Sequence, residues 1–228
     1  MGKVTIMPET IKNPYSFIGA CSGVAYDSDV TDDKKNYRRG KQCVADGHGR
    51  VLEFVDVYMI IEGYSTRTMR EIMRHVGDGL TVVQRSTRYC YEGGFEYYTP
   101  PVIEKNETVL KTYQDAMAAI EKSYHDLIGA GVPKEDAANI LPLGINTKLS
   151  MKKNARCLMD MSRVRLCNRA LKEARDFMND VVEALENYSP EWHELANQIF
   201  MPKCEALGFC NEKFSCGKYP RKSLLTKN

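Results

Sequence analysis

Residues 51–91 read VLEFVDVYMIIEGYSTRTMREIMRHVGDGLTVVQRSTRYCY. The stretch from Val51 to Ile61 is rich in β-branched and aromatic residues, which predicts a strand. Ser65 or Thr66 can cap a helix that we expect to end near His75. The Gly-Asp-Gly sequence at 77–79 interrupts this helix, and residues 80–91 are predicted to be extended.

The rest of the chain is predicted to be irregular before this stretch and helical after it. Residues 1–46 are polar, and 27–41 have too few apolar residues to pack, so a surface loop is expected there. Helices are expected over 106–129 with Asn106 as the cap, over 134–141, 154–166 and 168–188, and from Pro190 onward. Because strands precede helices without regular alternation, the predicted class is α+β, with one domain over 1–228 that ends in a cysteine-containing tail at 200–228.

The charge balance excludes several functional classes. The chain has 228 residues, with 32 Lys plus Arg, 30 Asp plus Glu and a net charge of +2. This balance argues against a strongly cationic nucleic-acid binder. No apolar run suits a membrane span or a secretory signal. We therefore expect a cytoplasmic protein that binds neither nucleic acid nor membrane.

A first polar cluster joins Arg74 and His75 to the segment 84–88, which reads QRSTR. In an extended segment Ser86 and Arg88 share one face, while Arg85 and Thr87 share the other. A hydroxyl and a guanidinium on one face suit a phosphate, because Arg binds phosphate oxygens bidentately. By composition alone, a solvated charged stretch is the favoured interpretation.

A second cluster is basic and lies between residues 148 and 169. Arg156, Asp160 and Arg163 fall near one face of the predicted helix over 154–166. The other members are Lys148, Lys152, Lys153, Asn154, Arg165 and Arg169. Taken alone, this pattern also fits an amphipathic helix with a solvated basic face.

Together the two clusters resemble a known family. Arg74-His75, followed by Ser86-Thr87-Arg88-Tyr89, resembles the Arg-His-Arg and Ser-x-Arg-Tyr signature of the flavin-dependent thymidylate synthases (ThyX). Further ordered matches are His48 with Glu53, the helix over 65–75, residues 135–143, Asn154-Ala155-Arg156 and residues 165–170. The likeness extends in order from about residue 45 to residue 185.

The resemblance implies a ThyX-like homotetramer, with active sites where subunits meet, that converts dUMP to dTMP. Methylenetetrahydrofolate would supply the carbon, and bound FAD, reduced by NADPH, would supply the hydride. By the resemblance, Arg165 stabilises negative charge on the uracil ring and Ser86 lies beside that ring without acting as a nucleophile. The other implied nucleotide-binding residues are Glu71, Arg74, Gln84, Arg85, Thr87 and Arg88. The implied flavin-binding residues are His48, Arg50, Arg74, His75, Val76, Gln84, Asn154, Arg156 and Asp160.

Several positions depart from the family pattern. Val76 stands where the signature has its second Arg, and Arg50 could restore that charge. Glu71 stands where the family usually has Gln. Ala138 replaces an Arg that helps to hold dUMP, a loss of ~1.5–3 kcal/mol unless Asn139 or Lys148 compensates. His48 fits either a flavin contact or an ordinary turn.

The eight cysteines suggest a further site, because clustered cysteines in a reducing compartment indicate metal more often than disulfides. Cys167, Cys204, Cys210 and Cys216 could supply four thiolates to a structural zinc that would pin the tail. Their spacing also fits metal-free thiols.

Two other functions fit the same residues. The chain could methylate or hydroxymethylate another pyrimidine nucleotide, as Ala138 and Glu71 allow. It could also be a non-catalytic homologue that binds nucleotide or flavin.

Overall fold

The computed structural model describes residues 2–75 and 81–225, and these build a four-stranded sheet around which the helices are arranged. The strand order is β1-β2-β4-β3, and every neighbouring pair is antiparallel. The strands are β1 (Lys3–Ile6), β2 (Asp56–Ser65), β3 (Thr81–Gln84) and β4 (Asn146–Asn154). This confirms the predicted α+β class with a small antiparallel sheet.

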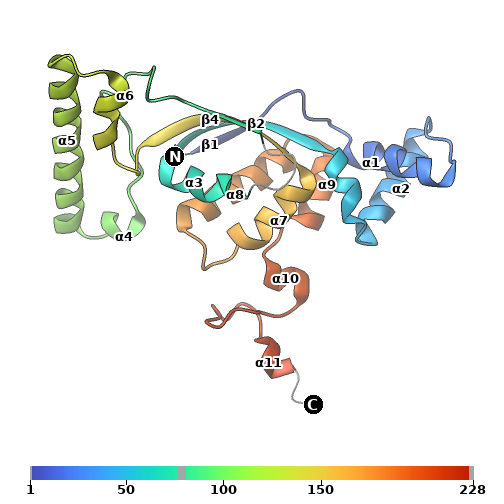
Figure 1. Cartoon of the computed structure of the whole chain (residues 1–228). Coiled ribbons are helices and arrows are strands. Elements are labelled where there is room, and N and C mark those ends of the chain that lie inside the picture. The colour runs from blue at the N-terminus through green and yellow to red at the C-terminus, as the bar shows by residue number, and fades with distance from the viewer. Residues whose placement is uncertain (1, 76–80, 226–228) are drawn as a thin grey trace.

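Four helices lie together on one side of the sheet (Figure 1). They are α3 (Thr66–Met73), α7 (Ala155–Arg165), α8 (Lys172–Glu186) and α9 (Pro190–Ile199). Their apolar faces meet the inward side chains of β2 in one core, which includes Val57, Met59, Ile61, Leu158, Phe177, Val181 and Trp192. The alternation of buried and partly exposed residues along β2 reflects the period of two of a strand with one buried face.

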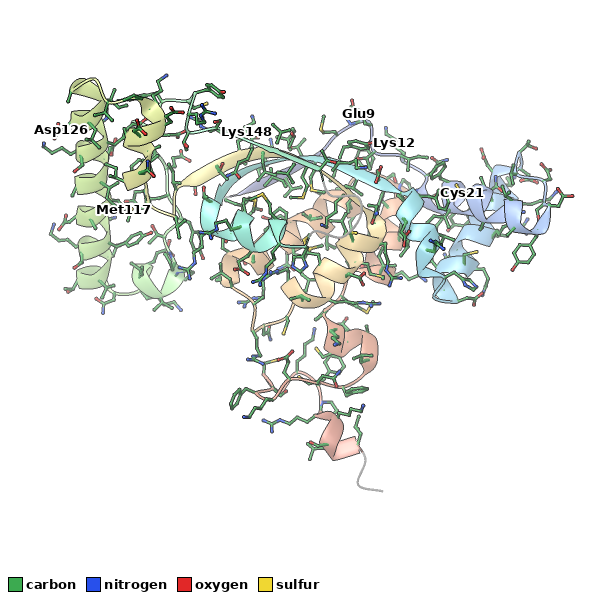
Figure 2. All side chains as sticks on the ribbon, in the orientation of Figure 1. Glu9, Lys12, Cys21, Met117, Asp126 and Lys148 are labelled. Carbon is green, nitrogen blue, oxygen red and sulfur yellow. The ribbon has the colours of Figure 1, made fainter. Side chains whose placement is uncertain are left out.

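Two groups of elements extend from opposite ends of the sheet. At one end are α4 (Pro101–Glu104), the long α5 (Glu107–Gly129), α6 (Lys134–Ala137) and the 3-10 turn η3 (Ala138–Ile140). At the other are α1 (Pro14–Gly23), η1 (Val24–Tyr26), α2 (Asp33–Ala45) and η2 (Gly49–Phe54). Figure 2 shows Met117 and Asp126 of α5 far from Cys21 of α1.

The C-terminal tail leaves the body below α7 (Figure 1). It carries α10 (Lys203–Leu207) and α11 (Lys222–Leu225). Arg169 forms an ion pair with Glu212 and ties the tail to the segment after α7. A second ion pair, between Lys218 and Glu205 at 2.8 Å, closes the tail upon itself.

The predicted loop over 27–41 is wrong, because most of it is α2. The carboxylate of Asp32 caps this helix by accepting from the backbone N–H groups of Lys34 and Lys35 at 3.0 and 3.1 Å. The helix packs closely on α1, with the ring of Tyr37 edge-on to that of Tyr15 and a close backbone approach at Gly40. A Cβ at Gly40 would lie 1.9 Å from the backbone oxygen of Tyr15, so only glycine allows this approach.

Other boundaries differ from the prediction too. Strands β1 and β4 were not predicted, and residues 49–54 form 3-10 helix, so that β2 begins only at Asp56. The predicted extended segment ends at Gln84 rather than near residue 91. The predicted break at 77–79 lies outside the described residues. Helix α5 is confirmed with its cap, since the side chain of Asn106 accepts from Val109 N at 3.2 Å. Helix α7 is confirmed too, and Asn154, predicted as its first residue, is its cap and accepts from Cys157 N at 2.8 Å.

A buried carboxylate fixes the start of α3. Glu173 of α8 is 3% exposed, and it accepts hydrogen bonds from Ser65 N, Ser65 Oγ and Thr68 Oγ1 at 2.5–2.6 Å. Ser65 in turn caps α3 by accepting from Thr68 N at 3.1 Å. Ionised acceptors make strong hydrogen bonds, so α3 is held firmly against α8. This clamp positions Glu71 and Arg74.

Candidate active site

Arg165 at the end of α7 is the best-fixed cation among the predicted site residues. It is 7% exposed, and its Nη2 donates to the backbone oxygen of Glu71 at 2.7 Å. Its Nε donates to Nε2 of His75 at 2.9 Å, and the carboxylate of Glu71 lies 3.2 Å from Nη2. A guanidinium fixed in this way presents positive charge in a defined place, which is what stabilisation of a developing anion requires.

The electrostatics around Arg165 keep His75 neutral. Burial, followed by the nearby positive charges of Arg165, Lys153 and Arg74, lowers the pKa of His75 to about 4. Glu71 remains ionised: partial burial opposes ionisation, but hydrogen bonding to Arg74 and the charge of Arg165 lower the pKa of its carboxyl. Arg74 lies 3.3 Å from that carboxylate. The structure therefore brings Glu71, Arg74, His75 and Arg165 together.

A second group of predicted nucleotide-binding residues lies at the end of β3. Gln84, Arg85, Ser86 and Thr87 line a cavity of about 450 Å³, and Ala138 lines it as well. Ala138, which stands where the resemblance expects an Arg, therefore lines the same cavity as residues 84–87. The lining of this cavity does not include Arg165 or Arg74.

Neither suggested substitute for the missing Arg is presented to this cavity. The ammonium of Lys148 forms an ion pair with Glu62 at 2.6 Å, across the β2–β4 pair. The amide of Asn139 donates to the backbone oxygen of Asp136 at 3.0 Å. Arg85 also lines the cavity, but its guanidinium is held by Glu92 at 2.9 Å.

The extended geometry predicted for residues 86–90 is wrong, because these residues form a turn, so the alternation of faces expected for Ser86 and Arg88 does not apply. The backbone N–H groups of Tyr89 and Cys90 both donate to Ser86 O, at 3.2 and 3.0 Å. Arg88 is exposed, and its Nε donates to Glu135 at 2.6 Å. An exposed ion pair of this kind contributes little to stability, so a competing anion can take over this guanidinium at low energetic cost.

The predicted flavin-binding residues lie partly around a second cavity, of about 290 Å³. His48 and Arg156 line it together with Arg163, and Asp160 forms ion pairs with Arg156 at 3.1 Å and with Arg163 at 3.6 Å. The Nε of Arg163 is buried and has no hydrogen-bond partner in the described structure. Two arginines with an unused donor suit an anionic group such as the diphosphate of a dinucleotide.

A close backbone approach shapes the same cavity. A Cβ at Gly49 would lie 1.6 Å from Nη1 of Arg156, so the guanidinium occupies the space that a side chain at position 49 would fill. The residues present here therefore fit part of FAD.

The remaining predicted flavin-binding residues are more scattered. Asn154 is 5% exposed and uses its side chain as the cap of α7. Gln84 donates to Thr147 Oγ1 at 3.1 Å, in the cavity lined by Ser86. Arg50 is exposed and is not part of the lining of the cavity near His48. Val76 lies outside the described residues.

Cys167, Cys204, Cys210 and Cys216 all line a cavity of about 370 Å³ between the end of α7 and the tail. All of them are free thiols. Within residues 2–75 and 81–225, no group of three or more His, Cys, Asp or Glu side chains is arranged to hold a metal ion. The zinc site therefore stays a prediction without geometric support.

Sequence reasoning assigned no role to Lys153, although its side chain contacts the site. Lys153 is fully buried, and its ammonium donates to the backbone oxygen of His75. A signal was present: Thr147, Leu149 and Met151 alternate inward along β4, and that period places Lys153 inward as well.

The comparisons with known proteins identify the family. The family model described as "Thymidylate synthase complementing protein" matches residues 7–191. The chain belongs to this family. Its curated relatives are named flavin-dependent thymidylate synthases, which confirms the family and enzyme class predicted from the sequence.

Two of these relatives show the extent of the match. The protein of Sulfolobus acidocaldarius is 30% identical over 182 residues, covering 78% of this chain and 66% of the relative. The protein of Clostridium tetani is 26% identical over 243 aligned positions, covering 96% of this chain and 94% of the relative. The likeness therefore includes the segments that carry the candidate site.

A solved structure has the same fold. A UMP/dUMP methylase from Streptomyces cacaoi, bound to 5-Br dUMP, superposes with a TM-score of 0.73 at 17% identity, covering 88% of this chain and 96% of the other.

In the described part of the chain, none of the helices has both the length and the apolar character that crossing a membrane requires.

Proposed function

We propose that the chain catalyses the reductive methylation of dUMP to dTMP, with methylenetetrahydrofolate as the carbon donor and NADPH as the reductant. The observation that carries this proposal is the buried guanidinium of Arg165, held by His75 and by the backbone of Glu71. Carbon 5 of uracil is a weak nucleophile, so a fixed cation beside the ring, where negative charge develops, lowers the barrier.

Different residues of the chain would bind the nucleotide, stabilise charge on its ring and bind the flavin. Arg165 stabilises negative charge on the ring, and Ser86 lies beside the nucleotide. Arg88, with the backbone of residues 84–87, holds the phosphate. Arg156 and Arg163 bind the anionic part of FAD in a cavity that His48 also lines. Bound FAD supplies the hydride once NADPH has reduced it.

We also propose that the enzyme is a cytoplasmic homotetramer whose active sites are shared between subunits. In one chain Arg165 and Arg74 do not line the cavity that Ser86 lines. A site formed by two subunits would unite them. Closed symmetric assemblies of identical chains are common among soluble proteins.

The first experiment measures whether the purified protein contains flavin and whether it forms dTMP. Purified protein should be yellow with a flavin spectrum, NADPH should bleach it anaerobically, and addition of dUMP and methylenetetrahydrofolate should yield dTMP. A colourless protein without turnover would favour the non-catalytic homologue. Light scattering should give the mass of four chains.

A mixing experiment tests the shared site. Arg88→Ala and Arg165→Ala chains, each impaired alone when assayed at a dUMP concentration near the wild-type KM, should regain part of the activity when co-expressed. No recovery in mixed tetramers would contradict a site formed by two subunits.

A second substrate is favoured by one observation. Ala138 faces the cavity of Ser86, and in the described structure Lys148 is paired with Glu62 and the amide of Asn139 is held by Asp136, so neither takes the place of the missing Arg. The resulting space could admit another pyrimidine nucleotide, and the solved relative is named a UMP/dUMP methylase. Turnover of UMP and dCMP, measured beside dUMP, decides between these substrates and identifies a methyl or hydroxymethyl product.

A further inference from the structure

Lys153 is a buried cation without a matching carboxylate. It lies near the end of β4 with 0% exposure, on the inward face that Leu149 and Met151 share. Lysine is rarely fully buried unless it is paired. Among the described residues no Asp or Glu forms an ion pair with Lys153. Its neighbour Lys152 points the other way and pairs with Asp56 at 3.0 Å.

The ammonium of Lys153 binds the residue that directly follows the C-cap of α3. It donates to the backbone oxygen of His75, while Arg165 donates to the backbone oxygen of Glu71. The final carbonyl groups of a helix have no partner within the helix, and the helix dipole makes this end attractive to cations. Two cations, one from β4 and one from α7, therefore hold the end of α3.

The hydrogen bond between Arg165 and His75 fixes the protonation state of the imidazole. A guanidinium only donates, so Nε2 of His75 must be the unprotonated acceptor and Nδ1 must carry the proton. The charged groups that face His75 are Arg165 from α7, Lys153 from β4, and Arg74 and Glu71 from α3. Three cations against one carboxylate disfavour an imidazolium, which would expel Arg165.

We propose that Lys153 is a positioning residue for Arg165: it anchors the backbone of His75 and, through its charge, preserves the imidazole as the acceptor for the Arg165 guanidinium. This inference rests on the proposed function only in so far as Arg165 acts on the nucleotide. The link between Lys153 and His75 is a property of the folded chain.

The test compares Lys153→Met with Lys152→Met in the full-length holoenzyme. Methionine keeps the length of the side chain but removes the charge and the donor. The control makes the same change one residue earlier, on the other face of β4. The readout is the titration of His75, followed by NMR of the protein labelled with ¹³C-histidine. The chain contains only four histidines, and a His75→Gln variant assigns the signal.

In the wild type and in Lys152→Met, His75 should remain neutral down to about pH 5. In Lys153→Met its pKa should rise by about one unit or more, because a nearby positive charge has gone. The acid limb of the pH profile of kcat for dUMP should move in the same direction. An unchanged titration in Lys153→Met, or an equal shift in Lys152→Met, would overturn the proposal.

A second variant guards against a folding defect. Lys153→Gln keeps a donor but loses the charge, so it should shift the titration of His75 in the same direction. If neither Lys153 variant folds, the residue is structural and the proposal is wrong. A wild type that shows the titration but no turnover of dUMP would contradict the proposed function and leave the role of Lys153 toward His75 intact.

Discussion

The Nε of Arg165 lies 2.9 Å from Nε2 of His75, so the last turn of α7 is joined to the end of α3 by a bond between two side chains. The bond exists only while the imidazole is neutral. A cation that can act on a substrate is thereby kept in place by a residue that does not compete with it for negative charge. Arg165 and His75 are therefore best regarded as one unit.

Arg165→Ala should reduce turnover of dUMP by ~10²–10³-fold, because one fixed donor for a developing anion contributes about that much. Flavin binding should change little and the protein should still fold, but the melting temperature should fall, because the hydrogen bonds of Arg165 to His75 and to the backbone of Glu71 are lost. Steady-state kinetics, flavin absorbance and calorimetry check the three parts. Arg38→Ala, at an exposed position on α2, is the control and should keep wild-type activity. A variant of Arg165 with more than a tenth of the wild-type rate would refute this role.

Arg88→Ala should weaken dUMP binding by about tenfold or more, as expected for loss of one charge-assisted hydrogen bond. Flavin content should be unchanged. Isothermal titration with dUMP measures the effect. The matched change is Glu135→Gln, which releases Arg88 from its 2.6 Å ion pair and should leave dUMP affinity equal or tighter. Loss of flavin alone in Arg88→Ala would contradict the assignment.

The stability of the protein should depend on pH through His75. Its pKa is about 4 in the folded chain, against an ordinary value of 6.5, so folding favours the neutral form. The stabilisation is complete above about pH 6.5 and is lost as the pH falls toward 4. Urea unfolding at a series of pH values should show a shallower loss for His75→Gln. The control His193→Gln, at an exposed position, should keep the wild-type slope.

Gly49→Ala should weaken flavin binding by about tenfold without unfolding the protein. The new Cβ would lie 1.6 Å from Nη1 of Arg156, and the flexible guanidinium would move out of the cavity at low cost. Its charge-assisted hydrogen bond to an anion would then be lost. Fluorescence titration with FAD measures the change. Gly129→Ala, where nothing lies within 4 Å of the added atom, should bind FAD normally.

Glu173→Gln should lower the free energy of unfolding by ~1.5–3 kcal/mol, because hydrogen bonds to a buried charged acceptor are replaced by weaker ones. Chemical denaturation gives the value. Asp176→Asn removes an exposed i,i+4 pair with Lys172 on the same helix and should cost less than ~0.5 kcal/mol. Equal effects of the two substitutions would show that the clamp on Ser65 is not a special contact.

The sequence predicted the elements whose signals are local. Helix α5 has a long apolar period and the cap Asn106, and α3 follows a capping Ser65, so both were found. Strand β4 was missed because Lys148 and Lys152 make it look like a solvated stretch. Their cross-strand partners, Glu62 and Asp56, are about 90 residues away in the sequence, and no local pattern reports such pairing.

Helix α2 and the contacts of Lys153 were also missed, because local sequence patterns do not report packing between elements. Helix α2 packs through the contact of Gly40 with α1, and a glycine carries no apolar signal that sequence patterns detect. Ordered motifs were enough to choose Arg165, His75 and Arg156. They did not reveal that Lys153 supports His75, because a buried lysine is understood only when the element packed over it is known.

The clamp formed by Glu173 has a consequence for heat inactivation. Ser65 ends β2, caps α3 and bonds to α8 through Glu173, so the start of α3 belongs to the same cooperative unit as the core. Local opening free energies vary across a protein, and binding segments are often among the weakest. In this protein the start of α3 is bonded to α8, whose apolar residues belong to the hydrophobic core. Loss of activity on heating should therefore coincide with melting of the whole fold rather than precede it.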